Sequence, residues 1–379
     1  MIEALYIHIP FCQAKCNYCD FYSFSGSSEE LQKRYVEALK QEAILSKDDL
    51  AINLKSIFFG GGTPTCLSGG LLVHLLEFLS ENFSLNPEIE ITIEANPGTV
   101  DLEKLKLLRK AGANRLSFGV QSFNPDLLKN LGRIHSPQDI YKSFNLAREA
   151  GFTNLNFDLM YGLPGQSLQD WEKTLLEVLK FNLEHISLYQ LKIEEDTPMG
   201  RELDKGLIQE FDDELALEMY RLTEKYLTQA GFIHYEISNY AKPGYQSRHN
   251  QIYWRCEPYL GLGVGAHSYL PPERVENLSD LSLYLKDLEE GNYPPSFTER
   301  QTLTAAMSET MFMGLRLLEG VNLEHFYNRF GLDARQVFQG AIQKCLKLGL
   351  IELENNYLRL TSQGVYLGNL VFEEFLLDN

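Results

Sequence analysis

Short runs of hydrophobic residues alternate along the chain with longer amphipathic segments. The short runs are rich in Ile, Leu, Phe and Tyr, as the buried strands of a sheet are. They lie at residues 5–9, 56–60, 90–95, 115–121, 154–162, 185–191 and 234–238. The segments between them have a helical pattern, and Ser27 with Glu30 forms a capping-box signature at the start of the first. The alternation predicts consecutive strand–helix units.

A weak internal repeat supports this prediction. The segments RKAGANRLSFGVQ, REAGFTNLNFDLM and TQAGFIHYEIS each combine a helix end, an Ala-Gly pair, a short link and a strand. Gly112, Gly151 and Gly231 fall at the helix ends, where glycine adopts a left-handed conformation at little cost. Such units predict an α/β fold with a parallel sheet, and a full or partial (β/α) barrel rather than a doubly wound sheet. In these barrels the chemistry collects at the carboxyl ends of the strands.

The pattern divides the chain into three parts. Residues 1–240 hold the strand–helix units, whereas the pattern loosens over residues 241–295. A new compact pattern covers residues 296–379, with helical stretches followed by a hairpin that turns at Glu354-Asn355-Asn356. This order predicts a small winged-helix-like α+β domain. Many winged helices bind DNA, but the acidic hairpin and the few Lys and Arg residues argue against that use.

The composition narrows the class of protein. The 379 residues carry a net charge of -18, and no basic run offers a site for nucleic acid. The first ten residues lack the features of a secretory signal, and no apolar run is long enough to predict a transmembrane helix. Six unevenly spaced cysteines do not form a disulfide framework, so we expect a cytoplasmic protein with reduced thiols. Peripheral membrane contact stays open, as does a homodimer through the apolar segment 365–377, which core packing also explains.

Half of the cysteines crowd into one short loop. Cys12, Cys16 and Cys19 follow the first predicted strand with a C-x3-C-x2-C spacing, at the mouth of the expected barrel. Three thiolates at this spacing can bind three irons of a 4Fe–4S cluster and leave the fourth iron without a protein ligand. A structural zinc site is the rival hypothesis, but it needs a fourth ligand. The candidates for that ligand are Cys66, Cys256, Cys345 and His8. Free thiols with a structural role are the third hypothesis.

This spacing after a first barrel strand resembles the radical S-adenosylmethionine (SAM) superfamily. The resemblance implies that SAM binds the open iron through its amino and carboxylate groups. In the segment FFGGGTPT, Gly61 and Gly62 let the backbone approach an amino group closely, and Thr63 offers a hydroxyl, although a tight turn also explains a glycine run. Polar residues at later strand ends and in one following loop complete a candidate cofactor site: Glu94, Gln121, Arg133 and Asp158.

A narrower resemblance covers nearly the whole chain, including the C-terminal domain. The motifs YIHIPFC, GGGTPT, GVQSFN, GRIHS, DLMYGLPGQ and GLGVGAHSY are similar to those of the oxygen-independent coproporphyrinogen III oxidase family. This implies a partial barrel of the radical SAM type with a cluster on the three cysteines. It also implies SAM contacts from Tyr6, Gly61, Gly62, Thr63, Glu94, Gln121, Arg133 and Asp158, with Tyr189 and His267 as further contacts.

Two features depart from the oxidases of that family. Those enzymes carry another cysteine two residues after the third, where this chain has Phe21. They also carry a substantial extension before the first strand, where this sequence has four residues before Leu5. Both features resemble the HemW-type heme chaperone branch, and so does the segment RHNQIYW at 248–254.

The segment RHNQIYW supplies candidate heme residues. His249 offers a neutral imidazole to heme iron, and Tyr253 and Trp254 offer flat apolar area to a porphyrin. Cys256 is the alternative ligand, and packing of the aromatics on the barrel is the structural explanation. We expect a chaperone that binds heme, a 4Fe–4S cluster and SAM, and that transfers heme to acceptor proteins. An oxygen-independent coproporphyrinogen III dehydrogenase is the alternative, and a radical SAM enzyme acting on another small molecule is a third hypothesis.

Overall fold

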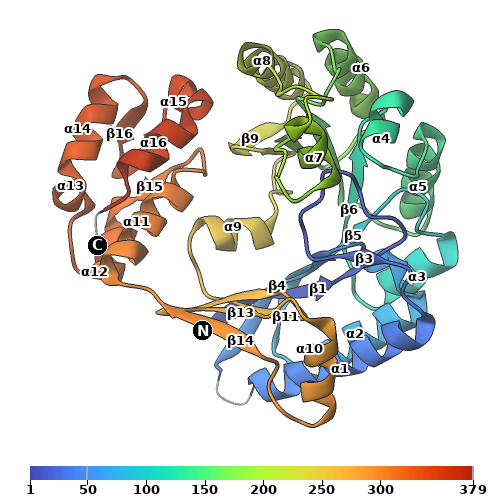
Figure 1. Cartoon of the computed structure of the whole chain (residues 1–379). Helices are drawn as coiled ribbons and strands as arrows, with labels where there is room; N and C mark the ends of the chain where they lie inside the picture. The colour runs from blue at the N-terminus through green and yellow to red at the C-terminus, as the bar shows by residue number, and fades with distance from the viewer. Residues whose placement is uncertain (48–49, 378–379) are drawn as a thin grey trace.

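A series of parallel strands forms the centre of the fold. The computed structural model describes residues 1–47 and 50–377. The series consists of β1 (Ile2–Ile9), β4 (Ile52–Gly61), β5 (Leu85–Ala95), β6 (Arg115–Gln121), β7 (Leu155–Tyr161) and β8 (His185–Gln190). Each of these strands pairs in parallel with the next, and together they form the curved sheet of Figure 1. The predicted (β/α) series with a partial barrel is confirmed.

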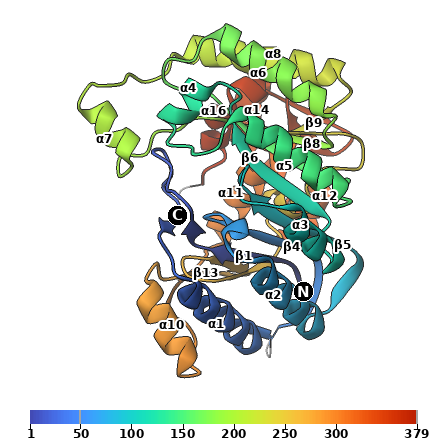
Figure 2. The same cartoon turned by 90° about the vertical axis from the view of Figure 1, so that its right-hand side faces the viewer.

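Helices cover the outer, convex face of this sheet, and Figure 2 shows them from outside. The main ones are α1 (Glu29–Lys47), α2 (Gly69–Asn82), α3 (Leu102–Lys110), α5 (Pro137–Glu149), α6 (Leu168–Val178) and α8 (Asp213–Gln229). Shorter helices α4 (Pro125–Asn130) and α7 (Pro198–Asp204) lie in the loops. Gly112, Gly151 and Gly231 adopt positive φ values after their helices, as predicted. The predicted capping box of the first helix is wrong, because Ser28 rather than Ser27 accepts from the backbone, at Leu31 N.

The predicted strand at 234–238 does not continue the parallel series. Its residues fall in β9 (Ile233–Glu236), which pairs antiparallel with β10 (Asn239–Ala241), and β10 pairs antiparallel with β8. A link of two residues is too short for the crossover that a parallel pair requires. The hairpin therefore ends the sheet on this side.

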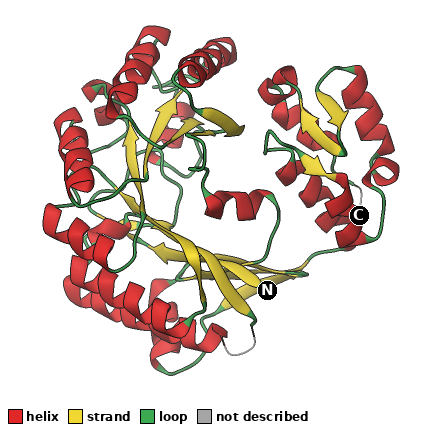
Figure 3. Cartoon of the chain, turned by 180° about the vertical axis from the view of Figure 1, so that it is seen from behind, coloured by secondary structure: helices red, strands yellow, loops and turns green. Residues whose placement is uncertain are grey.

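The chain then returns to the other edge of the sheet. β11 (Tyr259–Leu262) pairs in parallel with β1, on the side opposite β4. The antiparallel strands β12 (His267–Leu270), β13 (Glu273–Asn277) and β14 (Ser296–Arg300) follow, with α10 (Leu281–Glu289) between the last two. Before them, α9 (Arg248–Trp254) lies on the concave side of the sheet, as Figure 3 shows from behind.

The C-terminal part has a core of its own, formed by buried residues such as Phe326, Leu358 and Phe375. Its sheet has the order β15-β17-β16, with β15 (Val321–Asn322), β16 (Ile351–Glu354) and β17 (Tyr357–Leu360). Its helices are α11 (Leu303–Gly314), α12 (Leu323–Phe330), α13 (Ala334–Val337), α14 (Gln339–Lys347), α15 (Ser362–Tyr366) and α16 (Gly368–Glu374). The predicted hairpin is confirmed, and Asn355 and Asn356 form its turn with positive φ. Within the described ranges, no helix is long and apolar enough to span a membrane.

Candidate functional site

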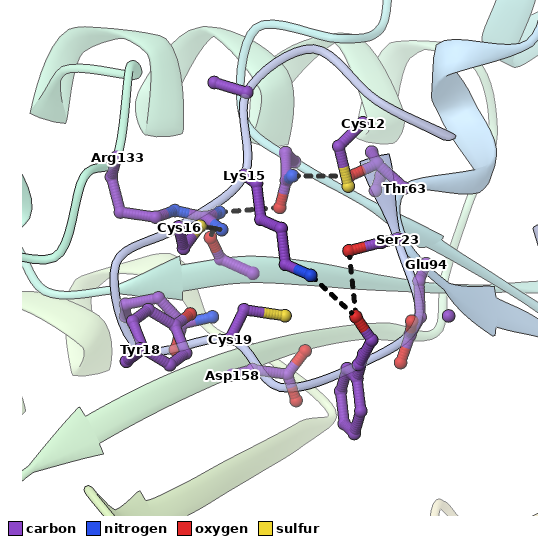
Figure 4. Close-up of a pocket in the computed structure, with 18 of the residues that line it drawn as sticks. Cys12, Lys15, Cys16, Tyr18, Cys19, Ser23, Thr63, Glu94, Arg133 and Asp158 are labelled. Carbon is purple, nitrogen blue, oxygen red and sulfur yellow. Dashed lines mark hydrogen bonds between the residues drawn. The ribbon is translucent and has the colours of Figure 1, made fainter. Parts of the chain in front are cut away.

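The cysteine loop lies over the carboxyl ends of the parallel strands. Cys12 ends the short strand β2 (Phe11–Cys12), which pairs with β3 (Phe24–Ser25), and Cys16 and Cys19 lie between these strands. The three cysteines line one cavity of about 400 Å³ (Figure 4). The structure brings most of the other predicted residues to the same cavity: Gly61, Gly62, Thr63, Glu94, Gln121, Arg133, Asp158 and Tyr189.

A chain of hydrogen bonds joins two of the cysteines through residues of the strand ends. Thr63 Oγ1 lies 3.7 Å from Cys12 Sγ and accepts from Asn96 Nδ2 at 2.8 Å. Arg133 donates from Nη2 to Asn96 Oδ1 at 2.6 Å and from Nη1 to Cys16 Sγ at 3.4 Å. The guanidinium group therefore places a positive charge beside the sulfur atom of Cys16.

The glycines of the GGGTPT motif allow close packing at the cavity wall. Gly61 has φ +103, and a Cβ atom there would lie 2.6 Å from the ring of His8. A Cβ atom on Gly62 would lie 3.0 Å from Cys12 Sγ. Both positions therefore require glycine, one for its conformation and both for the space.

Two buried carboxyl groups form the inner end of the cavity. Burial, and next the nearby charge of Asp158, raise the pKa of Glu94 to about 8. Burial also raises the pKa of Asp158, although Ser117 Oγ donates to it at 2.9 Å and Asn156 Nδ2 at 2.8 Å. The charge of Arg115 lowers both pKa values without cancelling the effect of burial, so a cation or a hydroxyl-rich ligand in the cavity would relieve this penalty further.

The donor set fits an iron–sulfur cluster better than a single metal ion. Over residues 1–47 and 50–377, no three His, Cys, Asp or Glu side chains converge closely enough to hold one ion. A zinc ion requires that convergence, whereas a 4Fe–4S cluster spreads its thiolates over different irons. Of the fourth ligands that zinc would need, Cys256 is buried away from the cavity lining and Cys345 lies in the C-terminal core. Burial raises the pKa of Cys12 and of Cys19, and a positively charged group bound there would counter that effect.

Tyr6 and His267 lie outside the cavity lining. Tyr6 is packed behind it, where its hydroxyl donates to His8 Nδ1 at 3.1 Å while His8 Nε2 donates to Tyr22 O at 2.9 Å. His267 is exposed on β12, with Nε2 3.9 Å from a carboxylate oxygen of Glu276. Direct contact of either residue with a ligand in the cavity is therefore not supported by this geometry.

The segment RHNQIYW forms α9 and lies inside the barrel rather than on an open loop. His249 is 1% exposed, and its ring stacks on Phe58 with centroids 5.0 Å apart. Its Nδ1 lies 2.9 Å from Ser56 Oγ, and its Nε2 lies 2.7 Å from the hydroxyl of Tyr253. Burial, and next the charge of Arg115, lower the pKa of His249 to about 3, so its ring is neutral. In this arrangement both ring nitrogens of His249 have hydrogen-bond partners inside the protein, so neither is open to a heme iron.

The remaining heme candidates are also engaged inside the protein. The ring of Tyr253 packs edge-on against Tyr259 at 4.6 Å between centroids. The guanidinium of Arg316 covers the ring of Trp254 at 4.4 Å. Cys256 is buried, and its carbonyl accepts from Arg329 Nη2 at 2.9 Å. These contacts match the packing explanation that the sequence left open.

Sequence reasoning missed several residues of the cavity. Its lining also includes Lys15, Tyr18, Phe21, Ser23, Asn96, Ser117, Gly119 and Met160. Asn96 directly follows β5, so its place at a strand end was a signal that could have identified it. The loop residues gave no such signal, because their direction depends on how the cysteine loop folds back over the strands.

Comparison with known families agrees with this architecture. The model of the radical SAM superfamily matches residues 6–178, and that of the HemN C-terminal domain matches residues 301–367. The solved structure of coproporphyrinogen III oxidase (HemN) from Escherichia coli, described as a radical SAM enzyme, superposes with a TM-score of 0.86 at 26% identity. The superposition covers 99% of this chain and 90% of that chain.

Similarity to characterised relatives extends over the full length. The chain is 39% identical to the heme chaperone HemW of Bacillus subtilis, over 99% of both proteins. It is 36% identical to heme chaperone HemW of Lactococcus lactis, over 100% of this chain and 98% of the relative. The identity to heme chaperone HemW of Escherichia coli is also 36%, over 99% and 98%. The chain therefore belongs to the HemW family within the radical SAM superfamily.

Proposed function

We propose that this protein is a heme chaperone, which binds heme and transfers it to acceptor proteins. The observation that carries the proposal is the full-length identity of 39% and 36% to proteins named heme chaperone HemW, against 26% to the oxidase HemN. Phe21 supports the same choice, because it occupies the position where the resemblance places an additional cysteine in the oxidases.

We further propose that the cavity holds a 4Fe–4S cluster and SAM. Cys12, Cys16 and Cys19 would bind the cluster, which in such proteins supplies the electron that cleaves a carbon–sulfur bond of SAM. Arg133 would pair with a carboxylate, and Glu94 and Asp158 would accept from amino or hydroxyl groups of the ligand. Gly61 and Gly62, Thr63, Gln121 and Tyr189 would shape the wall around it, whereas Tyr6 and His267 would act from outside the lining.

We propose heme contacts for His249, Tyr253 and Trp254 as well. Because both ring nitrogens of His249 are engaged inside the barrel, an axial bond from His249 requires that α9 leave its observed place. The experiment is a heme titration of the anaerobically reconstituted protein and of His249→Ala, followed at the Soret band. Saturable binding near one heme per chain supports the chaperone, and a changed spectrum in the variant assigns His249. Unchanged binding in the variant means that another residue is the axial ligand, and Cys256 is then tested next. Absence of specific heme binding in both proteins overturns the proposed function.

Oxidative decarboxylation of coproporphyrinogen III is the second candidate function. The TM-score of 0.86 to HemN favours it, since the superposition covers 99% of this chain and 90% of the oxidase chain. Its test is conversion of propionate to vinyl groups by the protein with intact cluster and SAM, and absence of turnover removes this candidate function.

A homodimer, peripheral membrane contact and a cytoplasmic location stay predictions. Sedimentation, liposome flotation and cell fractionation test them.

A further inference from the structure

The opening of the cysteine cavity differs in character from its inner end. The strand ends contribute the acidic side chains Glu94 and Asp158, with Tyr189 beside them. The cysteine loop, which lies over the strand ends, contributes Phe21, and 62% of the surface of Phe21 is exposed. Single exposed apolar residues are common on protein surfaces, but an exposed aromatic ring that lines a cavity beside an exposed lysine, Lys15, indicates a binding site.

The cysteine loop holds Phe21 in this exposed place. Its carbonyl oxygen accepts from Lys15 Nζ at 3.2 Å and from Ser23 Oγ at 3.3 Å, and Figure 4 shows both bonds beside the cysteines. These two bonds fix the backbone of a residue whose ring has no covering element. The exposure of the ring is therefore set by the loop and is available to a ligand.

The charges at the opening favour a ligand with both a flat apolar face and a carboxylate. Lys15 is exposed, lines the cavity and forms no ion pair among the described residues. Lys192, by contrast, pairs with Glu194 at 2.6 Å. On a chain with a net charge of -18, a lysine without an ion pair beside an exposed aromatic ring is a specific attraction for an anionic group.

The surface beside α9 has the opposite character. The hollow next to that helix is lined by charged residues of both signs: Glu3, Lys55, Glu88, Arg248, Arg255 and Glu257. His249 lies behind this surface, 1% exposed. Ile252 is the apolar side chain of the lining, and it is 7% exposed. A porphyrin would lose the hydration of the charges for little apolar contact, so this hollow is a poor first site for heme.

We propose that heme lies across the opening of the cysteine cavity, with its porphyrin face against Phe21 and one propionate beside Lys15. The proposal rests on the heme-chaperone function given above and adds the site. The cavity of about 400 Å³ is already assigned to the inner ligands, so heme covers the opening instead of entering it. Phe21 then explains a difference from the oxidases, since it replaces a thiol with a flat apolar surface.

The test compares Phe21→Ala with a matched control in the full chain carrying its reconstituted cluster. Phe297 on β14 is 60% exposed and does not line the cavity, so Phe297→Ala removes an equally exposed ring elsewhere. Heme is titrated at the Soret band, and metal-free protoporphyrin IX by its fluorescence. We expect Phe21→Ala to raise the dissociation constant about tenfold for both probes, because a ring–ring contact does not need iron. Phe297→Ala should change it less than about twofold.

The outcomes separate this proposal from the function on which it rests. If the unaltered protein binds no heme, the chaperone function fails and the site fails with it. If it binds heme and Phe21→Ala equals Phe297→Ala for both probes, the function stands and the site is overturned. A second variant, Lys15→Met, should weaken binding of both probes by several-fold and make it less sensitive to salt. Iron content of each variant, measured beforehand, confirms that the cysteine loop is intact.

Discussion

At the scale of single residues, the cysteine loop depends on a position that accepts no side chain. A Cβ atom on Gly62 would lie 2.8 Å from Phe11 O and 3.0 Å from Cys12 Sγ. The first of these atoms belongs to the backbone and cannot turn away as a side chain can. A substituent at Gly62 must therefore displace the strand that carries Cys12.

Gly62→Ala should accordingly lose most of its iron and sulfide after anaerobic reconstitution, and its free energy of unfolding should fall by about 1–3 kcal/mol, as overpacking typically costs. Gly70→Ala is the control, since a Cβ atom there meets nothing within 4 Å. Iron content and denaturant unfolding of both variants are the measurements. Equal iron content in the two variants would show that the loop tolerates the substituent.

Sequence reasoning found most of the cavity residues that stand at strand ends, with Asn96 as an exception, and in the cysteine loop it found only the cysteines. Gly61, Thr63, Glu94 and Asp158 could be assigned because parallel strands all end at one edge of the sheet. Phe21 could not, because the direction of its ring depends on hydrogen bonds across the folded loop.

At the scale of elements, α9 gives the clearest difference between pattern and structure. The segment RHNQIYW supplies the candidate heme residues, and in the structure it forms a helix on the concave side of the sheet (Figure 3). Glu90 fixes its start by accepting from the backbone nitrogens of Arg248 and His249, both at 3.2 Å. A helix of seven residues has too short a pattern to indicate which face is buried, so only the folded sheet shows where it packs.

Burial of His249 within α9 predicts a pH effect on stability. Its pKa of about 3 in the folded protein lies below the ordinary value of 6.5, so the unfolded chain binds more protons at acidic pH. The stabilising contribution is therefore complete above about pH 6.5 and is lost as the pH falls towards about 3. Between about pH 7 and about pH 4.5 the loss should be roughly 2.5 kcal/mol.

The contribution can be isolated with His249→Gln, because every other titrating group is common to both proteins. The difference in unfolding free energy between the unaltered protein and the variant should shrink by that amount on acidification. Denaturant unfolding at both pH values measures it. A difference independent of pH would mean that His249 titrates normally in the folded protein and that α9 is not packed as observed.

At the scale of the whole molecule, long-range pairing completes the sheet. β1 pairs with β4 on one side and, more than 200 residues later in the chain, with β11 on the other. The local pattern predicted the first neighbour and not the second, because residues 241–295 carry no repeating unit that specifies a partner. The same return of the chain brings α9 and the C-terminal core together, so contacts between them are set by the fold as a whole.

Arg329 of α12 makes two of the contacts that join these parts. Its Nη2 donates to Cys256 O at 2.9 Å and lies 3.1 Å from the hydroxyl of Tyr269 on β12. Arg329→Ala should therefore speed amide hydrogen exchange in α12 and around Cys256, by the equivalent of about 1–2 kcal/mol of local opening. Arg335→Ala, which removes an exposed pair with Asp333 inside the C-terminal part, should leave exchange around Cys256 unchanged. Similar exchange around Cys256 in the two variants would mean that other contacts, such as the ion pairs Arg255–Glu319 and Arg274–Glu309, hold the C-terminal part without Arg329.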